Sequence, residues 1–353
     1  MLPVEIIFLI DLLASFSVYL IISLSLNLEF GYGGVPNFGK VLAVAGGAFV
    51  VGSLPGRLLF NLMQINGNLD FITHNAAIIT QITNNLKINI PLSFSIFILA
   101  IVIAAIVGAI LGFIASYPAI RLREDYLGMT LLAMGEVLRV IGNNYPPLIG
   151  GSLGVQVPDP FAWIGGDLRF AITTFSMLFI AILIFIYVEF LIRSPLGRTL
   201  RAVRDNEIAA SALGKYIPMI RMKVLMVGSA LGAIGGALYA FYTSAVIAGT
   251  YNRVDWTFWP WTMVLLGGAA NNVGVALGTL IFVGARKLII FYKGLFAPYL
   301  PFDVVWLDML LLGTVLILVL IFKPEGVIPE KPTHTIKTNQ IKKILENKKE
   351  KSN

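Results

Sequence analysis

The sequence has no cysteine, only two histidines and few charged residues. Asp, Glu, Lys and Arg together make up 13% of the 353 residues, roughly half the share found in soluble domains. Without cysteine, the chain cannot form disulfides, thiol nucleophiles or Cys-ligated metal sites. His74 and His334 lie in polar segments and are expected to be solvated. We therefore expect no metal site and no cofactor.

A nucleotide-hydrolysing site is also not expected. Residues 34–40, GVPNFGK, nearly match the phosphate-binding loop, but Val41 stands where that loop needs a Ser or Thr to hold magnesium. No parallel strand is evident before it, and the chain has no HExxH motif. We predict no catalytic residues, so the chain is not expected to be an enzyme.

Most of the chain is apolar. Hydrophobic residues make up 57% of the sequence, the mean hydropathy is +0.84, and the apolar runs are continuous rather than alternating. This composition predicts an all-α, polytopic helical membrane protein embedded in a lipid bilayer. The net charge of +7 resides in the loops and the tail, as the positive-inside rule expects, so we do not expect binding to nucleic acid.

The apolar runs predict about nine transmembrane helices, with about eight to ten allowed by interrupted runs. The first run lacks a basic start and an obvious cleavage site and is expected to be a retained span. Residues 1–322 are predicted to form the membrane domain, with the loop 193–221 and the lysine-rich tail 323–353 in the cytoplasm. Residues 64–90 and 143–169 are predicted external loops. The predicted spans are 4–28, 38–62, 91–118, 126–142, 170–192, 222–245, 257–293 with breaks, and 304–322.

Two glycine-rich stretches resemble each other. Residues 33–49 read GGVPNFGKVLAVAGGAF, and residues 267–282 read GGAANNVGVALGTLIF. Glycine and proline at these points are expected to break a helix in or near the membrane. Interrupted helices in corresponding halves of a chain suggest an inverted repeat with a transport pathway at its interface. The candidate pathway residues are Gly33, Gly34, Pro36, Asn37, Gly267, Gly268, Asn271 and Gly274.

The longest charged interruption is residues 193–215, RSPLGRTLRAVRDNEIAASALGK. Its five basic residues would cost about 10–15 kcal/mol at bilayer depth, so the segment must lie in water or against a partner. Ser194 and Pro195 predict the start of one short helix, and Asp205 is the expected cap of a second that ends at Gly214. An ordinary solvated loop remains the alternative.

Some polar and aromatic residues allow two interpretations. Glu136 and Arg139 lie three apart inside a predicted span, where they are either functional charges or a pair that fixes helix register. The aromatic residues Trp256, Phe258, Trp259 and Trp261 predict a belt at the membrane surface, with a substrate-facing role as the alternative. The cluster Arg286, Lys287 and Lys293 falls on the external side and violates the charge rule. Asp11, Glu29, Glu189 and Asp308 lie in or near spans but do not form the pattern of a proton relay.

The combination of motifs resembles the permeases of branched-chain amino acid ABC transporters. The likeness begins with the cytoplasmic signature at 194–214 and extends over most of the chain. It includes GYGGVPNFG at 31–39, the segment 120–140, NNYPPLIGGSLGV at 143–155, the glycine-rich span at 228–237, VLLGGAANNVG at 264–274 and FKPEGV at 322–327. The order of these motifs is more specific than any one of them.

The resemblance implies that the short Ala-rich helix docks in a groove of a cytoplasmic ATP-hydrolysing subunit. It also implies a second permease chain, often not identical, two ATP-binding subunits and an extracytoplasmic solute-binding protein. The sequence departs from the family pattern at Asn37, Lys40, Ala270 and Asn271, which fall at the helix breaks. The implied contact and flanking residues are Arg198, Arg201, Arg204, Asp205, Glu207, Ala209, Ala210 and Gly214.

The expected function is therefore that of the membrane-spanning subunit of an ABC importer in the cell membrane. Its expected substrate is a branched-chain or related amino acid, moved by alternating access that a separate ATPase drives. A permease of the same architecture for urea, a short amide, a nucleoside or a sugar is the first alternative. An ion-coupled secondary transporter is the second.

Overall fold

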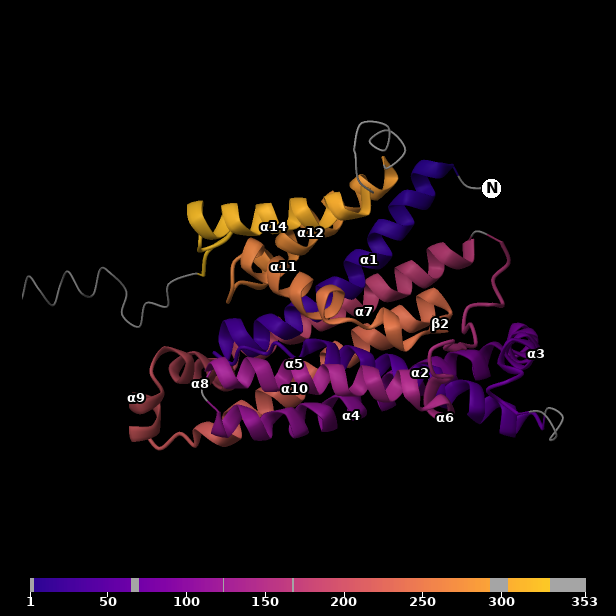
Figure 1. Cartoon of the computed structure of the whole chain (residues 1–353), viewed down its shortest axis with the longest axis horizontal. Helices are drawn as coiled ribbons and strands as arrows, with labels where there is room; N and C mark the ends of the chain where they lie inside the picture. The colour runs from indigo at the N-terminus through magenta and orange to yellow at the C-terminus, as the bar shows by residue number, and fades with distance from the viewer. Residues whose placement is uncertain (1–2, 65–69, 123, 167, 293–303, 331–353) are drawn as a thin grey trace, which may run out of the picture.

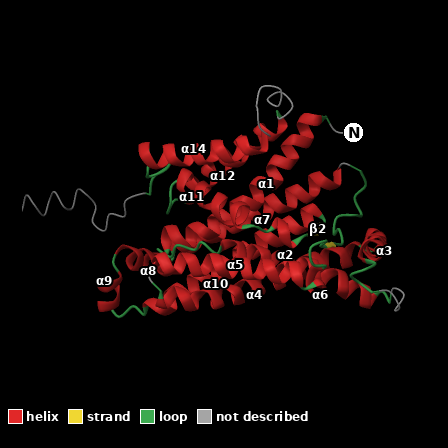
Figure 2. Cartoon of the chain, viewed as in Figure 1, coloured by secondary structure: helices red, strands yellow, loops and turns green. Residues whose placement is uncertain are grey.

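The computed structural model describes residues 3–64, 70–122, 124–166, 168–292 and 304–330, and these are almost entirely helical (Figures 1 and 2). Within them the strands are a single two-residue antiparallel pair, Val155–Gln156 (β1) with Ala245–Val246 (β2). The predicted all-α membrane fold is confirmed. The helices that frame the molecule are α1 (Val4–Leu26), α2 (Lys40–Leu62), α4 (Ile90–Arg121), α5 (Glu124–Asn144), α7 (Leu168–Arg193), α10 (Ile217–Thr243), α12 (Asn272–Phe291) and α14 (Val304–Phe322).

Shorter elements join these helices. They are η1 (Asn27–Tyr32), a π-helix that continues α1, then α3 (Asn75–Ile88), α6 (Pro146–Ile149), α8 (Pro195–Asp205), α9 (Glu207–Ala212), η2 (Ala248–Thr250), η3 (Val254–Phe258) and α11 (Trp259–Gly267). The segment 64–90, predicted as a loop, therefore contains α3. Its Ile78, Ile82 and Leu86 are fully buried in a cluster with Leu59 and Ile96, so a helical apolar stripe was hidden within an Asn- and Thr-rich composition.

Six helices of the described residues are long and apolar enough to cross a membrane: Val4–Tyr32, Lys40–Leu62, Ile90–Arg121, Leu168–Arg193, Ile217–Thr243 and Asn272–Phe291. The helices α5, α11 and α14 do not belong to this set. In α5, Glu136 and Arg139 interrupt the apolar sequence, and α11 has only nine residues. The total of about nine spans stays a prediction.

The helix α10 packs between α2 and α4 at the centre of the molecule. A Cβ atom on Gly236 would lie 1.9 Å from the carbonyl oxygen of Val44, and one on Gly47 would lie 1.9 Å from that of Ala233. On the other side, a Cβ on Gly108 of α4 would lie 2.6 Å from the Ser229 carbonyl oxygen. The backbones approach this closely only because glycine occupies the crossing points, as membrane helices with small residues at regular intervals do.

The three tryptophans of the expected surface belt are buried instead, whereas Phe258 exposes 39% of its surface. Trp256, Trp259 and Trp261 expose 2%, 6% and 8% of their surface. Trp256 stacks on Tyr19, with ring centroids 5.5 Å apart, and Trp261 stacks on Phe38 at 4.6 Å. The belt prediction is wrong because η3 and α11 turn inward against α1, which the sequence near a span end does not reveal.

Residues 150–154, GGSLG, have the spacing of the GxSxG nucleophile motif but not its geometry. Gly150, Gly151 and Gly154 all have positive φ, and the segment is a turn between α6 and β1. The motif needs a sharp turn from a strand into a helix, with the serine at its top. This segment therefore gives no sign of a hydrolase.

The helices run roughly along the long axis of the molecule and define two ends (Figure 1). The helices α8 and α9 lie at one end, where α14 leads into residues 323–330. The start of α1, with α3, α6 and β2, lies at the other end. Residues 327–328 turn back onto α11: Val327 N donates to Leu266 O at 2.9 Å, and Ile328 N to Gly267 O at 3.0 Å. The start of the predicted tail is thus packed, and residues 331–353 lie outside the described residues.

Candidate functional site

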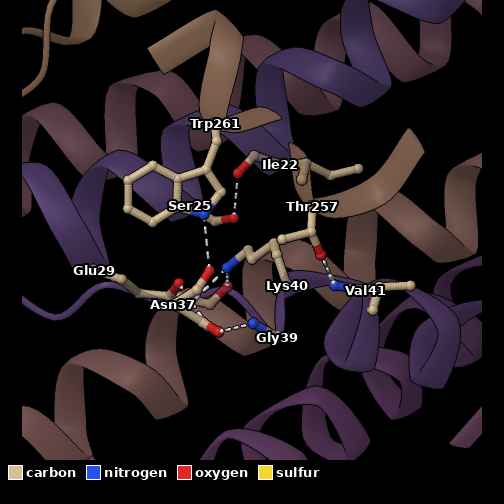
Figure 3. Close-up of polar contacts among 10 residues, drawn as sticks. Ile22, Ser25, Glu29, Asn37, Gly39, Lys40, Val41, Thr257 and Trp261 are labelled. Atoms are coloured by element: carbon tan, nitrogen blue, oxygen red, sulfur yellow. Dashed lines mark hydrogen bonds and ion pairs between the residues drawn. The ribbon is translucent and has the colours of Figure 1, made fainter. Parts of the chain in front are cut away.

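The first helix break carries a fully buried ion pair (Figure 3). Residues 33–39 separate η1 from α2, and Lys40 Nζ lies 2.9 Å from Glu29 Oε1 across this gap, with neither side chain exposed. Asn37 Nδ2 donates to the other carboxylate oxygen, Glu29 Oε2, at 3.0 Å, and Lys40 also donates to Gly228 O at 3.1 Å. Both carboxylate oxygens therefore have partners, which an ion pair away from water requires.

Glycines of α10 make the space for this pair. A Cβ on Gly228 would lie 2.2 Å from Glu29 Oε1, and one on Gly232 would lie 3.0 Å from Lys40 Cε. The glycine-rich span, expected to serve helix packing, thus also accommodates the charges. Glu29 and Lys40 were not among the candidate residues, although two opposite charges on either side of a Gly/Pro break were a signal for them.

Asn37 and its neighbours join the first break to η3 and α11 (Figure 3). Asn37 Oδ1 accepts from Gly39 N at 2.9 Å, just before the first turn of α2. Trp261 Nε1 donates to the Asn37 carbonyl at 3.1 Å, and Val41 N donates to Thr257 Oγ1 at 3.1 Å. The first turn of α2 is therefore held by side chains that come from the other half of the chain.

The second break also combines glycine with asparagine, but here the asparagine caps the following helix. Gly268 has φ +110°, and Asn271 caps α12 by accepting from Gly274 N at 3.2 Å. A Cβ on Gly267 would lie 2.3 Å from Gly274 O, so glycine permits the tight turn. Asn271 Nδ2 donates to Pro329 O at 3.1 Å, which brings residues 323–330 onto this break.

The short helix η1, which leads into the first break, contacts the second break. Ala270 N donates to Asn27 Oδ1 at 2.8 Å, and Asn27 Nδ2 donates to Asn272 Oδ1 at 3.0 Å. A Cβ on Gly31 would lie 2.6 Å from Ala270 N. The second break is therefore joined to the helix that leads into the first, although the two stretches are far apart in the sequence. The inverted repeat with a pathway at its interface stays a prediction.

A cavity of about 690 Å³ adjoins the first break. Pro36 and Phe38 line it from the break, Met129 and Leu132 from α5, and Phe258 from η3. Its walls are largely apolar. Of the candidate pathway residues, Pro36 is the one that faces it. Glu136 and Arg139 lie further along α5, where Arg139 Nε donates to Glu136 Oε1 at 3.0 Å and each side chain is about one-third exposed.

The charged loop forms the two short helices that its sequence predicts. Ser194 Oγ accepts from Leu196 N at 3.2 Å and caps α8, and Gly214, with φ +77°, follows the end of α9. The cap of α9 is Asn206, which accepts from Ala209 N at 2.9 Å. The prediction of Asp205 is wrong by one residue because Asn and Asp cap equally well; Asp205 instead ends α8.

Arg204 connects this loop to the first break. Its Nη1 donates to Gly31 O at 2.6 Å, and its Nη2 lies 3.0 Å from Glu330 Oε2 and 3.0 Å from Asp205 Oδ1. A Cβ on Gly34 would lie 3.0 Å from Arg204 Cγ. Partial burial disfavours the charged guanidinium, but Glu330 and Asp205 outweigh it and raise the pKa of Arg204.

The remaining arginines of the loop differ from one another. Arg201 lies over the Tyr32 ring, with its guanidinium carbon 5.5 Å from the centroid. Arg198 is exposed. Arg201 and Arg204 thus contact the first break, whereas Arg198 faces outward.

The outer face of α9 carries exposed apolar side chains, both large and small. Ile208 and Leu213 expose 85% and 80% of their surface, and Ala209 between them is also exposed. Glu207 is exposed and pairs with Arg221. Ala210 is 3% exposed and points into the fold, so it is not part of the surface that a partner would meet. Ile208 and Leu213 were missed, although large apolar residues in a solvated helix were a signal.

Comparison with known proteins agrees with this architecture. A family model described as branched-chain amino acid transport system / permease component matches residues 8–320. The probable branched-chain amino acid transport permease protein LivM of Methanocaldococcus jannaschii is 44% identical over 333 residues, which cover 94% of this chain and 95% of that protein. The high-affinity branched-chain amino acid transport system permease protein LivM of Salmonella typhimurium is 28% identical over 254 residues, which cover 64% of this chain and 56% of that protein.

No solved structure matches the chain. The family match covers most of the sequence, and the first relative aligns with nearly all of it. Members of this family are membrane subunits of transport systems. The chain therefore belongs to the family of permease components of branched-chain amino acid transport systems.

Proposed function

We propose that this chain is the membrane-spanning subunit of an ABC importer that translocates branched-chain or related apolar amino acids. In this proposal it acts with a second permease chain, two cytoplasmic ATP-binding subunits and an extracytoplasmic solute-binding protein. The names of its relatives support the substrate class. The end that carries α8 and α9 is the cytoplasmic end, since lysine and arginine concentrate in residues 193–223, which include both helices.

The observation that supports this function best is the bond between Arg204 and Gly31. The outer face of α9, with Ile208, Ala209 and Leu213, is the surface that the ATP-binding subunit contacts. Because α8 leads directly into α9, a displacement of α9 reaches Arg204 and, through its 2.6 Å bond, the carbonyl of Gly31 in η1. The movement thus enters the membrane at the first helix break.

The ion pair and the contacts of η1 with the second break then transmit that movement to other helices. Glu29 and Lys40 hold η1 and α2 together, and Asn27 holds η1 to the second break. A displacement of η1 therefore moves the start of α2 and the second break together with it. Moving a two-state equilibrium from 1:99 to 99:1 needs about 5.5 kcal/mol of differential binding, which ATP binding in the partner subunits supplies.

Reconstitution tests this function. The chain is co-purified with its permease and ATP-binding partners and reconstituted in liposomes. The solute-binding protein is added on the side from which the substrate is loaded. Leucine uptake that requires ATP, and that isoleucine and valine inhibit but urea and ribose do not, supports the proposal. Uptake that an ion gradient drives without the ATP-binding subunits would overturn it, and inhibition by urea or ribose would overturn the substrate class.

A further inference from the structure

A second group of charged side chains lies between α1, α10 and α12, nearer the end of the molecule opposite α9 (Figure 1). Lys287 Nζ lies 2.6 Å from Asp11 Oδ2, and the Tyr242 hydroxyl donates to Asp11 Oδ1 at 3.1 Å. Beside Lys287, the Arg286 guanidinium lies over the Trp259 ring, 3.5 Å from its centroid. These charges belong to apolar helices of membrane-spanning length, where ionised residues are costly and mark functional sites by default.

Two adjoining cavities, of about 510 and 250 Å³, open onto this group. Asp11, Tyr242 and Lys287 belong to the walls of both. The larger cavity is mainly apolar, and the smaller one adds polar side chains. The apolar wall includes Ile7, Phe8, Phe170 and Phe291, and the polar wall includes Ser15, Tyr19, Tyr239 and Arg286.

The Asp11–Lys287 pair is accessible, unlike the pair at the first break. The Asp11 side chain is 42% exposed and that of Lys287 is 21% exposed, whereas Glu29 and Lys40 expose nothing. Asp11 and Lys287 therefore border open space within the fold, whereas Glu29 and Lys40 are enclosed by it. The two ion pairs have different roles: one closes a helix break, and the other borders a cavity.

We propose that this Asp11 pocket, formed by the two cavities and the charges between them, binds a zwitterionic α-amino acid with an apolar side chain. The ammonium group pairs with Asp11, the carboxylate pairs with Lys287, and the side chain enters the apolar cavity. Insertion of the ligand replaces one ion pair by two, so no charge is left unpaired in a poorly solvated place. The inference rests on the proposed function and adds a site to it.

The charge pattern favours this ligand over simpler ones. A free anion or an anionic lipid headgroup would pair with Lys287 but would face the carboxylate of Asp11. A simple cation would pair with Asp11 but would face the ammonium group of Lys287. A zwitterion satisfies both signs at once, and the apolar cavity next to them accounts for a hydrophobic side chain.

Equilibrium binding to the full chain tests the pocket. Radiolabelled leucine is titrated onto the purified chain in nanodiscs of neutral lipid, and thermal unfolding checks that each variant is folded. Asp11→Asn and Lys287→Gln should each weaken leucine binding about tenfold or more, because each removes a charge-assisted contact. The matched controls Glu5→Gln and Lys87→Gln, exposed residues outside the pocket, should bind leucine as the wild type does.

Two leucine analogues separate contact from structural support. 4-Methylpentanoate lacks the ammonium group, and leucinol lacks the carboxylate. In Asp11→Asn, the preference for leucine over 4-methylpentanoate should shrink, while its preference over leucinol persists. In Lys287→Gln, the preference for leucine over leucinol should shrink, while its preference over 4-methylpentanoate persists. A pair that only supports the fold would weaken all three ligands equally, and that result would overturn the proposal.

Three further results would overturn the proposed pocket or the proposed function. Absence of saturable leucine binding, or binding that neither variant changes, would overturn the pocket. Displacement of leucine by anionic lipid in a manner that depends on Lys287 would identify a lipid site instead. If the assembled transporter still imports leucine with ATP in those cases, the pocket fails and the proposed function stands; if it imports no amino acid, the proposed function itself fails.

Discussion

Lys40 and Glu29 form a 2.9 Å ion pair across the first helix break, and neither side chain reaches the surface. The pair joins the end of η1 to the first residue of α2, at the place where η1 also receives the bond from Arg204. A buried pair of this kind adds little stability as a pair, but removal of one partner leaves an uncompensated charge. It therefore specifies the conformation of the break more than it strengthens the fold.

The first prediction follows from that asymmetry. Lys40→Met should lower the free energy of unfolding by about 3–5 kcal/mol because it leaves Glu29 buried without its cation, whereas the double variant Lys40→Met/Glu29→Met should recover most of the loss. Chemical unfolding in detergent measures both. Lys215→Met, at an exposed lysine after α9, is the control and should change stability by less than about 0.5 kcal/mol. If Lys40→Met alone were as stable as the wild type, that result would contradict the pairing of Lys40 with Glu29.

The second prediction concerns the crossing of α2 and α10. Gly236→Ala should destabilise the chain strongly, since the added Cβ would lie 1.9 Å from the Val44 carbonyl oxygen. Overpacking of this kind costs about 1–3 kcal/mol or more. Gly284→Ala, in the middle of α12 with nothing within 4 Å of the new Cβ, is the matched control and should be neutral or slightly stabilising. Thermal unfolding in the same detergent compares them, and equal melting temperatures would refute the close crossing.

The third prediction concerns the outer face of α9. Ala209→Trp should leave the melting temperature unchanged because Ala209 is exposed, but it should reduce co-purification of the ATP-binding subunits about tenfold or more, as a bulky residue at the centre of an interface can. Ala76→Trp, exposed on α3 at the other end of the molecule, is the control. Full recovery of the partners with Ala209→Trp would place their contact elsewhere.

The sequence predicts the membrane fold, the helix breaks and the caps because these depend on local properties. Glycine and proline at 33–39 interrupt a helix wherever it lies, and Ser194 caps α8 through its own next turn. Apolar runs of sufficient length likewise predict spans without knowledge of their neighbours. Where two adjacent residues suit a role equally, as Asp205 and Asn206 do at the cap of α9, local reasoning cannot choose between them.

The site depends on contacts between distant residues, and the sequence alone does not reveal them. Nothing local to Arg204 shows that it bonds to Gly31, and nothing local to Lys287 shows that Asp11 is its partner. The sequence places Lys287 on the external side, against the charge rule, and does not reveal that it pairs with Asp11 in the fold. Lys293, from the same cluster, lies outside the described residues. The buried Trp256 shows the same limit, since an aromatic residue near a span end suits both a core and a membrane surface.

The central claim is that Arg204 transmits movement from the ATP-binding subunits to the helix break, and one ratio tests it most directly. That ratio is the number of leucine molecules imported per ATP hydrolysed, measured in liposomes that contain the assembled transporter. With Arg204→Ala, we predict that the complex assembles and hydrolyses ATP while the ratio falls about tenfold or more, with Arg204→Lys intermediate because it retains the charge but not the planar fork. A ratio in Arg204→Ala equal to that of the wild type would contradict the account.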